Sequence, residues 1–173
     1  SAAIPCTIIR PGMIYGAGSV NWTGKLFRLA SLDPMPLPGD GFGSAFPIHI
    51  DDVVDLLVTA AEHPAAAGEI FNCAPDPSPT WREFLGSYAR LKHNPRWLPL
   101  PMLPFYMLAG IAMLFAPPVS MARDLPDLLS FIQRTTTYKM DKARTLLGWS
   151  PRCDLETGIA SCAPWLREQG WLS

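Results

Sequence analysis

Residues 46–74 read FPIHIDDVVDLLVTAAEHPAAAGEIFNCA, and this stretch decides the fold class. The short apolar run at 46–50 is typical of a buried strand, and a second such run follows at 69–74. Between the two runs, a helix opens at the acidic pair 51–52 and closes before Pro64. A strand, a helix and a strand in this order indicate a parallel α/β layer.

The helix of this stretch has polar residues along one face, at positions 52, 55, 59 and 62. Its other positions are apolar, so we expect most of the helix to be buried. The acidic pair Asp51-Asp52 is the expected N-cap.

Outside this stretch the pattern predicts more elements of both kinds. An apolar run from Ile4 to Arg10 predicts a strand that ends at Pro11-Gly12. Apolar spacing from Trp22 predicts a helix, and the Pro- and Gly-rich segment 33–44 predicts a loop. Further helices are expected after the capping box that begins at Thr80, at 140–147 and at 155–166.

The segment 98–119 is almost wholly apolar and is broken by prolines. Its uninterrupted part, 105–116, is shorter than the roughly 20 residues of a membrane span. We expect a buried helix there. A substrate-pocket element or a peripheral membrane contact through 103–116 is the alternative.

Composition limits the classes of protein that this sequence can encode. The chain has 173 residues, of which 49% are hydrophobic and 17% charged, with a net charge of −1. The length suits one domain, the apolar content excludes disorder, and the absence of a basic excess excludes nucleic acid as a partner. The four cysteines show no metal-ligand spacing, so we expect reduced core thiols and no metal site.

No catalytic set is evident from the residues themselves. The glycines at 16–18 and at 39–43 fail the spacing of a dinucleotide fingerprint. His49 lies beside Asp51 and Asp52, but a packed histidine and capping carboxylates explain this arrangement better than a catalytic pair. The residues alone therefore indicate an α/β protein with an unusually apolar C-terminal part.

Three segments resemble the C-terminal half of extended short-chain dehydrogenases, the NAD-dependent epimerase/dehydratase family. Residues 7–16, TIIRPGMIYG, resemble the strand that ends in R-P-x-x-x-Y-G. Residues 47–53, PIHIDDV, resemble the segment that leads into a helix and then a G-x-x-[FY]-N strand, here 68–72. Residues 142–151, KARTLLGWSP, resemble the run K-A-x-x-x-L-G-[WYF]-x-P.

This resemblance implies a fold and a domain organisation. The fold expected is the C-terminal part of a Rossmann-type NAD(P)-binding fold plus a small, mostly helical substrate-binding region. Segments 1–18 and 46–76 would form the Rossmann side, and segments 19–45 and 77–173 the substrate-binding part. The family's glycine-rich turn and Y-x-x-x-K pair are absent from this sequence, so we expect 1–173 to be an inactive fragment of a larger enzyme with no catalytic residue of its own.

The resemblance also implies site residues for NAD or NADP and for a small-molecule substrate. Pro11, Gly12 and Met13 match the turn beside the nicotinamide, where a glycine lets the backbone approach the ring. Met13, Tyr15 and Phe46 would contact the substrate, together with Phe105 of the apolar segment.

The apolar segment is similar to the branch of 3β-hydroxysteroid dehydrogenases and dihydroflavonol reductases. That branch implies an oxidoreductase acting on an apolar hydroxy or keto compound, sterol- or flavonoid-like. For the full-length protein we expect a cytoplasmic location, with membrane association as the alternative, and a homodimer. Sugar-nucleotide members usually place an arginine just before the segment that matches 47–53, where this chain has Ser44, Ala45 and Phe46. Arg28, Arg82 and Arg134 are the remaining candidates for a diphosphate. The alternatives are a sugar-nucleotide epimerase or dehydratase, and a non-catalytic NAD(P)-binding sensor or membrane-surface module.

Overall fold

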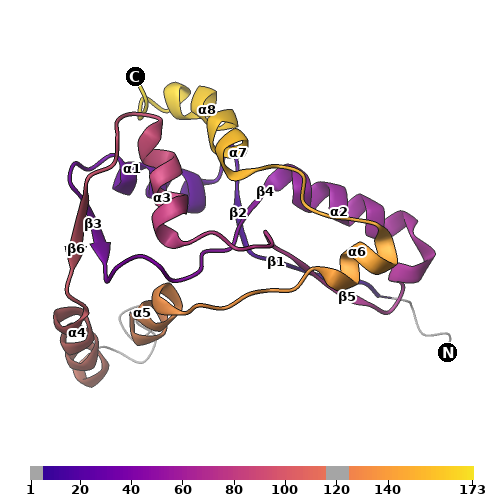
Figure 1. Ribbon diagram of the computed structural model, residues 1–173, viewed down its shortest axis with the longest axis horizontal. Helices are drawn as coiled ribbons and strands as arrows, with labels where there is room; N and C mark the ends of the chain where they lie inside the picture. The colour runs from indigo at the N-terminus through magenta and orange to yellow at the C-terminus, as the bar shows by residue number, and fades with distance from the viewer. Residues whose placement is uncertain (1–5, 116–124) are drawn as a thin grey trace.

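The computed structural model describes residues 6–115 and 125–173, and its strands form three parallel pairs with helices around them (Figure 1). Residues 4–5 of the expected first strand and 116–119 of the apolar segment lie outside the described residues. The pairs are β1 (Ile8–Pro11) with β5 (Ile70–Cys73), β2 (Met13–Tyr15) with β4 (Pro47–His49), and β3 (Met35–Pro38) with β6 (Trp97–Leu100). Parallel pairing confirms the predicted α/β class.

The helices occupy nearly all the positions that the sequence predicts. They are α1 (Leu26–Ala30), which follows the π-helical turn η1 (Val20–Lys25), α2 (Ile50–Glu62), the short 3₁₀ turn η2 (Pro64–Ala66), α3 (Trp81–Arg90), α4 (Met102–Phe115), α5 (Leu125–Gln133), α6 (Asp141–Leu147), α7 (Leu155–Ser161) and α8 (Ala163–Glu168). The loop expected at 33–44 is wrong in part, because β3 lies within it.

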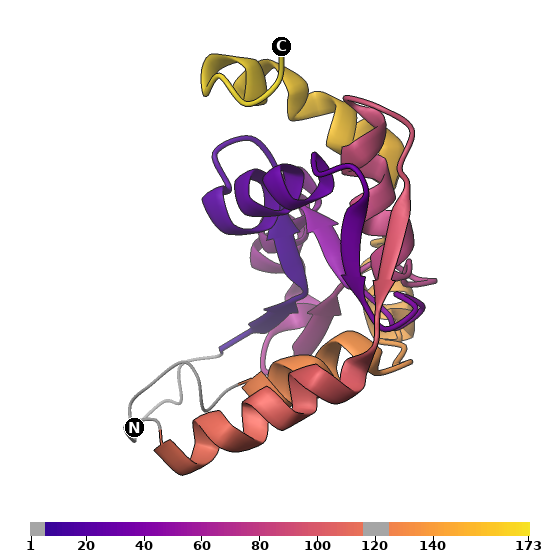
Figure 2. The same cartoon turned by 90° about the vertical axis from the view of Figure 1, so that its left-hand side faces the viewer.

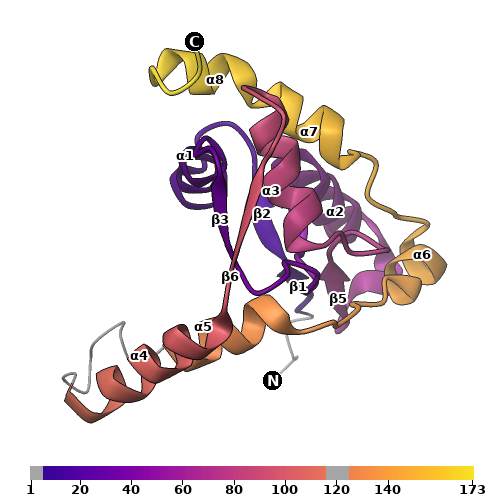
Figure 3. The same ribbon diagram turned by 60° about the vertical axis from the view of Figure 1, so that its left-hand side comes forward.

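Two clusters of buried side chains hold these elements together. Figures 2 and 3 show how the helices and strands that carry them are arranged. One cluster joins β2 and β3 to α1, α3, α7 and α8 through large side chains such as Phe27, Phe84 and Tyr88. The other joins α2, β5 and α6 through Leu56, Phe71 and neighbouring side chains. The β1–β2 segment therefore runs between the two clusters.

The N-cap of α2 differs from the prediction. His49, and not the acidic pair, caps the helix, because its Nδ1 accepts the backbone N–H of Asp51 at 3.3 Å. Asp52 lies in the first turn and is 5% exposed. Its carboxylate is therefore free to bind another part of the chain.

The expectation that α2 is mostly buried is also wrong. Val53, Leu56 and Ala60 are buried, but Val54, Leu57 and Val58 are 49–51% exposed. These exposed side chains form a second apolar face of the helix, directed away from the described residues. The sequence shows that apolar residues lie on both faces of the helix, but it does not show whether both faces are covered by other elements.

The helix α4 contradicts the expectation of a buried helix more strongly. Leu103, Met107 and Ile111 are 68%, 61% and 53% exposed, and Ala109 is the only residue of α4 classed as buried among those with a described side chain. No helix within the described residues is both long enough and apolar enough to span a membrane.

Candidate functional site

A pocket of about 420 Å³ lies where the β1–β2 turn meets the start of β4 and the end of β5. We call it the aromatic pocket. Its lining residues are Arg10, Pro11, Gly12, Met13, Phe46, Asn72, Ala74, Phe131 and Tyr138. They come from segments far apart in the sequence, and the parallel pairing of β1 with β5 brings them together.

The turn at the floor of the pocket is fixed by two backbone hydrogen bonds. Gly12 donates its N–H to the carbonyl oxygen of Cys73 at 2.9 Å, and Met13 donates its N–H to that of Phe46 at 2.7 Å. The turn is thus attached both to the end of β5 and to the residue before β4. Such attachment makes the floor of the pocket rigid.

Aromatic rings form the wall opposite the turn. Phe46 makes an edge-to-face contact with Tyr138 at a centroid distance of 4.6 Å, and Phe131 lies 6.3 Å from Phe46. The segment of Tyr138 is held in place by Asn72, whose side-chain amide donates to the carbonyl oxygen of Lys139 at 3.3 Å. Arg10 is the one charged residue among those that line this pocket.

The structure brings together four of the predicted site residues and separates the other two. Pro11, Gly12, Met13 and Phe46 all line the aromatic pocket, whereas Tyr15 and Phe105 do not. Asn72 was visible in the sequence as the last residue of the G-x-x-[FY]-N motif. Phe131 and Tyr138 carried no motif, and only the fold reveals them.

Tyr15 is a core residue at the end of β2, two residues beyond Met13, and does not reach the aromatic pocket. It is 2% exposed and makes edge-to-face contacts with His49 and Phe84 at 5.3 and 5.8 Å. Burial raises the pKa of its phenol above the ordinary value, so the hydroxyl keeps its proton at neutral pH. Phe105 is half-buried in α4 and lines neither the aromatic pocket nor the pocket beside Tyr15.

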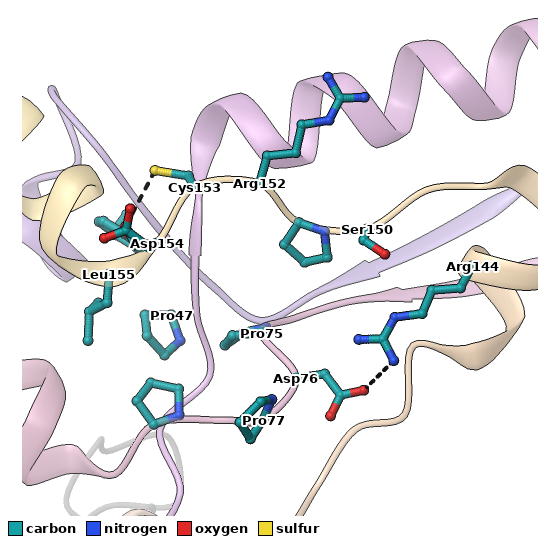
Figure 4. Close-up of a pocket in the computed structure, with 13 residues that line it drawn as sticks. Pro47, Pro75, Asp76, Pro77, Arg144, Ser150, Arg152, Cys153, Asp154 and Leu155 are labelled. Carbon is teal, nitrogen blue, oxygen red and sulfur yellow. Dashed lines mark hydrogen bonds and ion pairs between the residues drawn. The ribbon is translucent and has the colours of Figure 1, made fainter.

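A second pocket, of about 410 Å³, adjoins Tyr15 (Figure 4). Prolines 47, 75, 77 and 79 line one side, and the strap 150–155 lines the other. Asp76 and Arg144 form an ion pair of 3.0 Å across its edge. Since these charges are already paired, the pocket offers less unpaired charge to a ligand than its residue types alone would indicate.

The strap is held by the buried carboxylate of Asp52. Its Oδ1 accepts the backbone N–H of Arg152 at 2.9 Å, and its Oδ2 accepts that of Cys153 at 3.2 Å. Trp149, just before the strap, donates its indole N–H to Asp55 at 2.8 Å. The sequence predicted Asp52 as part of the N-cap of the helix. Its role is structural, but it is to fasten the strap to α2.

His49 is fully engaged in packing. Its Nδ1 accepts from the backbone, and its Nε2 lies 3.3 Å from Oγ of Ser161, which donates to the carbonyl oxygen of Gly158 at 2.8 Å. Both ring nitrogens therefore lie within hydrogen-bonding distance of the protein's own groups. The packed role predicted for His49 is confirmed. Among the described side chains, no group of three or more His, Cys, Asp or Glu residues is placed to hold a metal ion.

Comparison with known proteins agrees with this arrangement. No family model matches the chain. The chain is 32% identical over 170 residues to UDP-glucose 4-epimerase of Vibrio cholerae, a match that covers 94% of this chain and 47% of that protein. It is 23% identical over 169 residues to the uncharacterized protein y4nL of Sinorhizobium fredii, covering 94% and 48%. The chain thus spans about half the length of the curated relatives it matches.

Solved structures show the same partial coverage. An epimerase of Methanothermobacter thermautotrophicus matches with a TM-score of 0.70 and 22% identity, over 96% of this chain and 44% of that one. UDP-glucuronic acid 4-epimerase of Bacillus cereus, solved with UDP-glucuronic acid and NAD, matches with a TM-score of 0.64 and 18% identity, over 95% and 46%. These likenesses confirm the predicted fold, the C-terminal part of a Rossmann-type fold.

The comparisons also bear on the family. The chain is similar in sequence to UDP-glucose 4-epimerase and in fold to solved epimerases, as the resemblance to extended short-chain dehydrogenases led us to expect. This similarity gives no support to the branch of 3β-hydroxysteroid dehydrogenases and dihydroflavonol reductases that the apolar segment had indicated.

Proposed function

We propose that the protein is an NAD(P)-dependent sugar-nucleotide epimerase or dehydratase and that this chain forms one wall of its active site. The observation that carries the proposal is the aromatic pocket. Its floor, Pro11 to Met13, is the turn that resembles the family's nicotinamide-side turn, and it meets Phe46 from a separate segment. The similarity to UDP-glucose 4-epimerase favours a sugar nucleotide over the apolar substrate that we first expected.

The pocket suits a dinucleotide's nicotinamide end and an adjoining sugar. Its volume of about 420 Å³ and its aromatic wall fit flat or ring-shaped groups, and the rigid turn supplies backbone against which a ring can lie. NAD or NADP, when bound, supplies a hydride acceptor and donor. The residues of this chain orient the reactants and exclude water. The acid/base tyrosine and its lysine precede the matching strand in the family, so we propose activity for the whole protein only.

Arg10 is the best-placed cation for a diphosphate in this proposal. Of the three candidates from the sequence, Arg28 lies over the ring of Trp171 at 5.9 Å and Arg82 over that of Trp97 at 4.9 Å. Neither lines the aromatic pocket, and Arg134 does not line it either. Arg10 does line it, whereas the stretch 44–46, where sugar-nucleotide members usually place an arginine, contains none.

A second candidate keeps the first expectation of an oxidoreductase for an apolar hydroxy or keto compound. The composition of the pocket lining favours this candidate. Met13, Phe46, Phe131 and Tyr138 supply apolar or aromatic surface, and one lining side chain is charged. A binding role without catalysis, the cytoplasmic location and a homodimer also stay predictions.

The experiment is an epimerase assay of the complete gene product with NAD and UDP-glucose or UDP-glucuronic acid, followed by NMR of the sugar C4 proton. We expect interconversion of the C4 epimers. Tyr138→Ala should raise KM at least about tenfold, because it removes an aromatic wall. Tyr106→Ala is the matched control, since the two tyrosines are 41–42% exposed and Tyr106 lies outside the pocket.

Two results would overturn the proposal. One is turnover of an apolar ketone with NAD(P)H and none of any sugar nucleotide, which selects the second candidate. The other is an equal loss of activity in both tyrosine variants, which removes the pocket from the site.

A further inference from the structure

The largest run of exposed apolar side chains lies along α4 and its neighbours, and we call it the α4 patch. Its members share exposures between 41% and 68% and comprise Leu98, Leu103, Tyr106, Met107, Leu108, Ile111 and Leu128. They come from β6, from α4 and from α5, which packs beside α4 in all three views (Figures 1–3). The aromatic pocket does not include any of them.

The side chains of α4 are arranged around the helix in a coherent way. At about 100° per residue, Met102, Phe105 and Ala109 fall together on the inner face. These three are buried or half-buried. The exposed side chains then cover an arc of about 200°, from Tyr106 round to Leu108. Every side chain described in this arc is apolar except for the hydroxyl of Tyr106.

An arc of this width favours one kind of cover. A helix that docks in a protein groove presents an apolar stripe little wider than about 100° and keeps a polar back. α4 has no such polar face. Its inner face is covered by its own protein, and the rest of its described surface is apolar. A fluid hydrocarbon phase covers such a surface without needing a complementary shape.

The charge pattern points the same way. From Trp97 to Ala122 the sequence contains no Asp, Glu, Lys, Arg or His. The single polar group described on the exposed arc, the Tyr106 hydroxyl, donates to Gln133 at 2.7 Å and is therefore already paired. The patch offers nothing to a charged protein surface and little to the anionic headgroups of lipids. Its complement is uncharged and apolar.

The length of α4 fixes how deeply it can enter a bilayer. Its 14 residues extend about 21 Å, less than the roughly 30 Å of hydrocarbon core. In Figure 1, α4 lies at the opposite end of the long axis from β5 and α6, and so the patch projects from one end of the molecule. We propose that α4 is a monotopic membrane anchor that inserts its 200° apolar arc into one leaflet of a lipid bilayer. This proposal does not depend on the proposed function.

The test is flotation of the complete gene product with phosphatidylcholine vesicles at low and high salt. We expect binding that salt does not weaken, since the patch carries no charge. Met107→Lys/Ile111→Lys places two charges at the centre of the arc and should lower the bound fraction by about tenfold or more. Val20→Lys/Leu32→Lys is the matched control, because these residues are 56% and 49% exposed outside the patch. Circular dichroism should show that both variants are folded.

Each other outcome overturns the anchor. Equal binding by both variants places the membrane contact elsewhere. Absence of binding, with a dimer that the α4 variant converts to monomer, assigns the patch to a second copy of the chain. Absence of binding by a monomer whose α4 amides resist hydrogen exchange assigns it to the remainder of the protein.

Discussion

A Cβ atom on Gly12 would lie 2.2 Å from the carbonyl oxygen of Phe46. That oxygen also accepts the N–H of Met13 at 2.7 Å, so it cannot move away without losing the bond that fixes the turn. The sequence suggested that this glycine makes room for a nicotinamide ring. In the structure, the missing side chain of Gly12 makes room for the carbonyl group of Phe46. The glycine therefore supports the pocket by allowing the turn at its floor to form.

We therefore expect Gly12→Ala to destabilise the protein by about 1–3 kcal/mol, as overpacking in a well-packed site does. Urea unfolding of the complete protein measures this change. Gly110→Ala is the control, because no atom lies within 4 Å of the added methyl group in α4, and it should be neutral or slightly stabilising. Equal stability of Gly12→Ala and the wild type would contradict the close contact.

The sequence predicted the elements near the centre of the fold well because their signals are local. The capping box at Thr80 and Glu83 is present as expected, and Gly148 ends α6 in a left-handed conformation. Two features escaped prediction because they depend on the rest of the fold. β3 is a strand in spite of two prolines, since β6 pairs with it along its whole length. The apolar residues of α4 lie exposed because no described element covers them.

The sequence predicted those residues of the candidate site that belong to local motifs and missed those that only the fold brings to the pocket. The turn from Pro11 to Met13 and the position of Phe46 belong to motifs, so resemblance found them. Phe131 and Tyr138 reach the pocket from the far C-terminal half, where no motif marks them. Tyr15 lies two residues beyond Met13, and the alternation of a strand points both side chains to the same face. The pocket nevertheless ends at Met13, and Tyr15 continues into the core.

The contact between Gly158 and Tyr15 provides a second prediction. A Cβ on Gly158 would lie 2.2 Å from the phenol oxygen of Tyr15 and 3.0 Å from its Cζ. Gly158→Ala should cost about 1–3 kcal/mol, and Tyr15→Phe should restore part of that loss by removing the oxygen. A double-mutant cycle with urea unfolding measures the coupling. Strictly additive effects would show that the two residues do not meet.

The adjacent aspartates at the start of α2 give a matched pair. Asp52 is buried and binds the backbone of Arg152 and Cys153, whereas the side chain of Asp51 is 85% exposed. Asp52→Ala should cost about 2–3 kcal/mol, because it leaves two partly buried N–H groups without a charged acceptor. Asp51→Ala should cost less than about 1 kcal/mol.

Hydrogen exchange distinguishes this local effect from a general one. The amides of Arg152 and Cys153 should exchange faster in Asp52→Ala and not in Asp51→Ala. If the two variants have equal stability and equal exchange, the carboxylate of Asp52 does not hold the strap.

The capping box of α3 predicts a dependence of stability on pH. Glu83 accepts the backbone N–H of Thr80 at 2.7 Å and its hydroxyl at 2.9 Å, and these bonds hold the pKa of the carboxyl below its ordinary value. A lowered folded-state pKa contributes stability above the unfolded-state pKa, and this contribution is lost as the pH falls through the folded-state pKa. The wild type should therefore exceed Glu83→Gln in stability at neutral pH by about 0.5–1 kcal/mol.

That difference should vanish as the solution is acidified below the ordinary range of a glutamate, because both side chains are then uncharged. Urea unfolding at a series of pH values measures it, with Glu168→Gln, at an exposed position in α8, as the control. The control should differ little from the wild type throughout. If the Glu83→Gln difference stayed constant down to strongly acid pH, the amide would be a poorer partner for Thr80 for a reason other than charge. The negative charge of Glu83 would then play no part in starting α3.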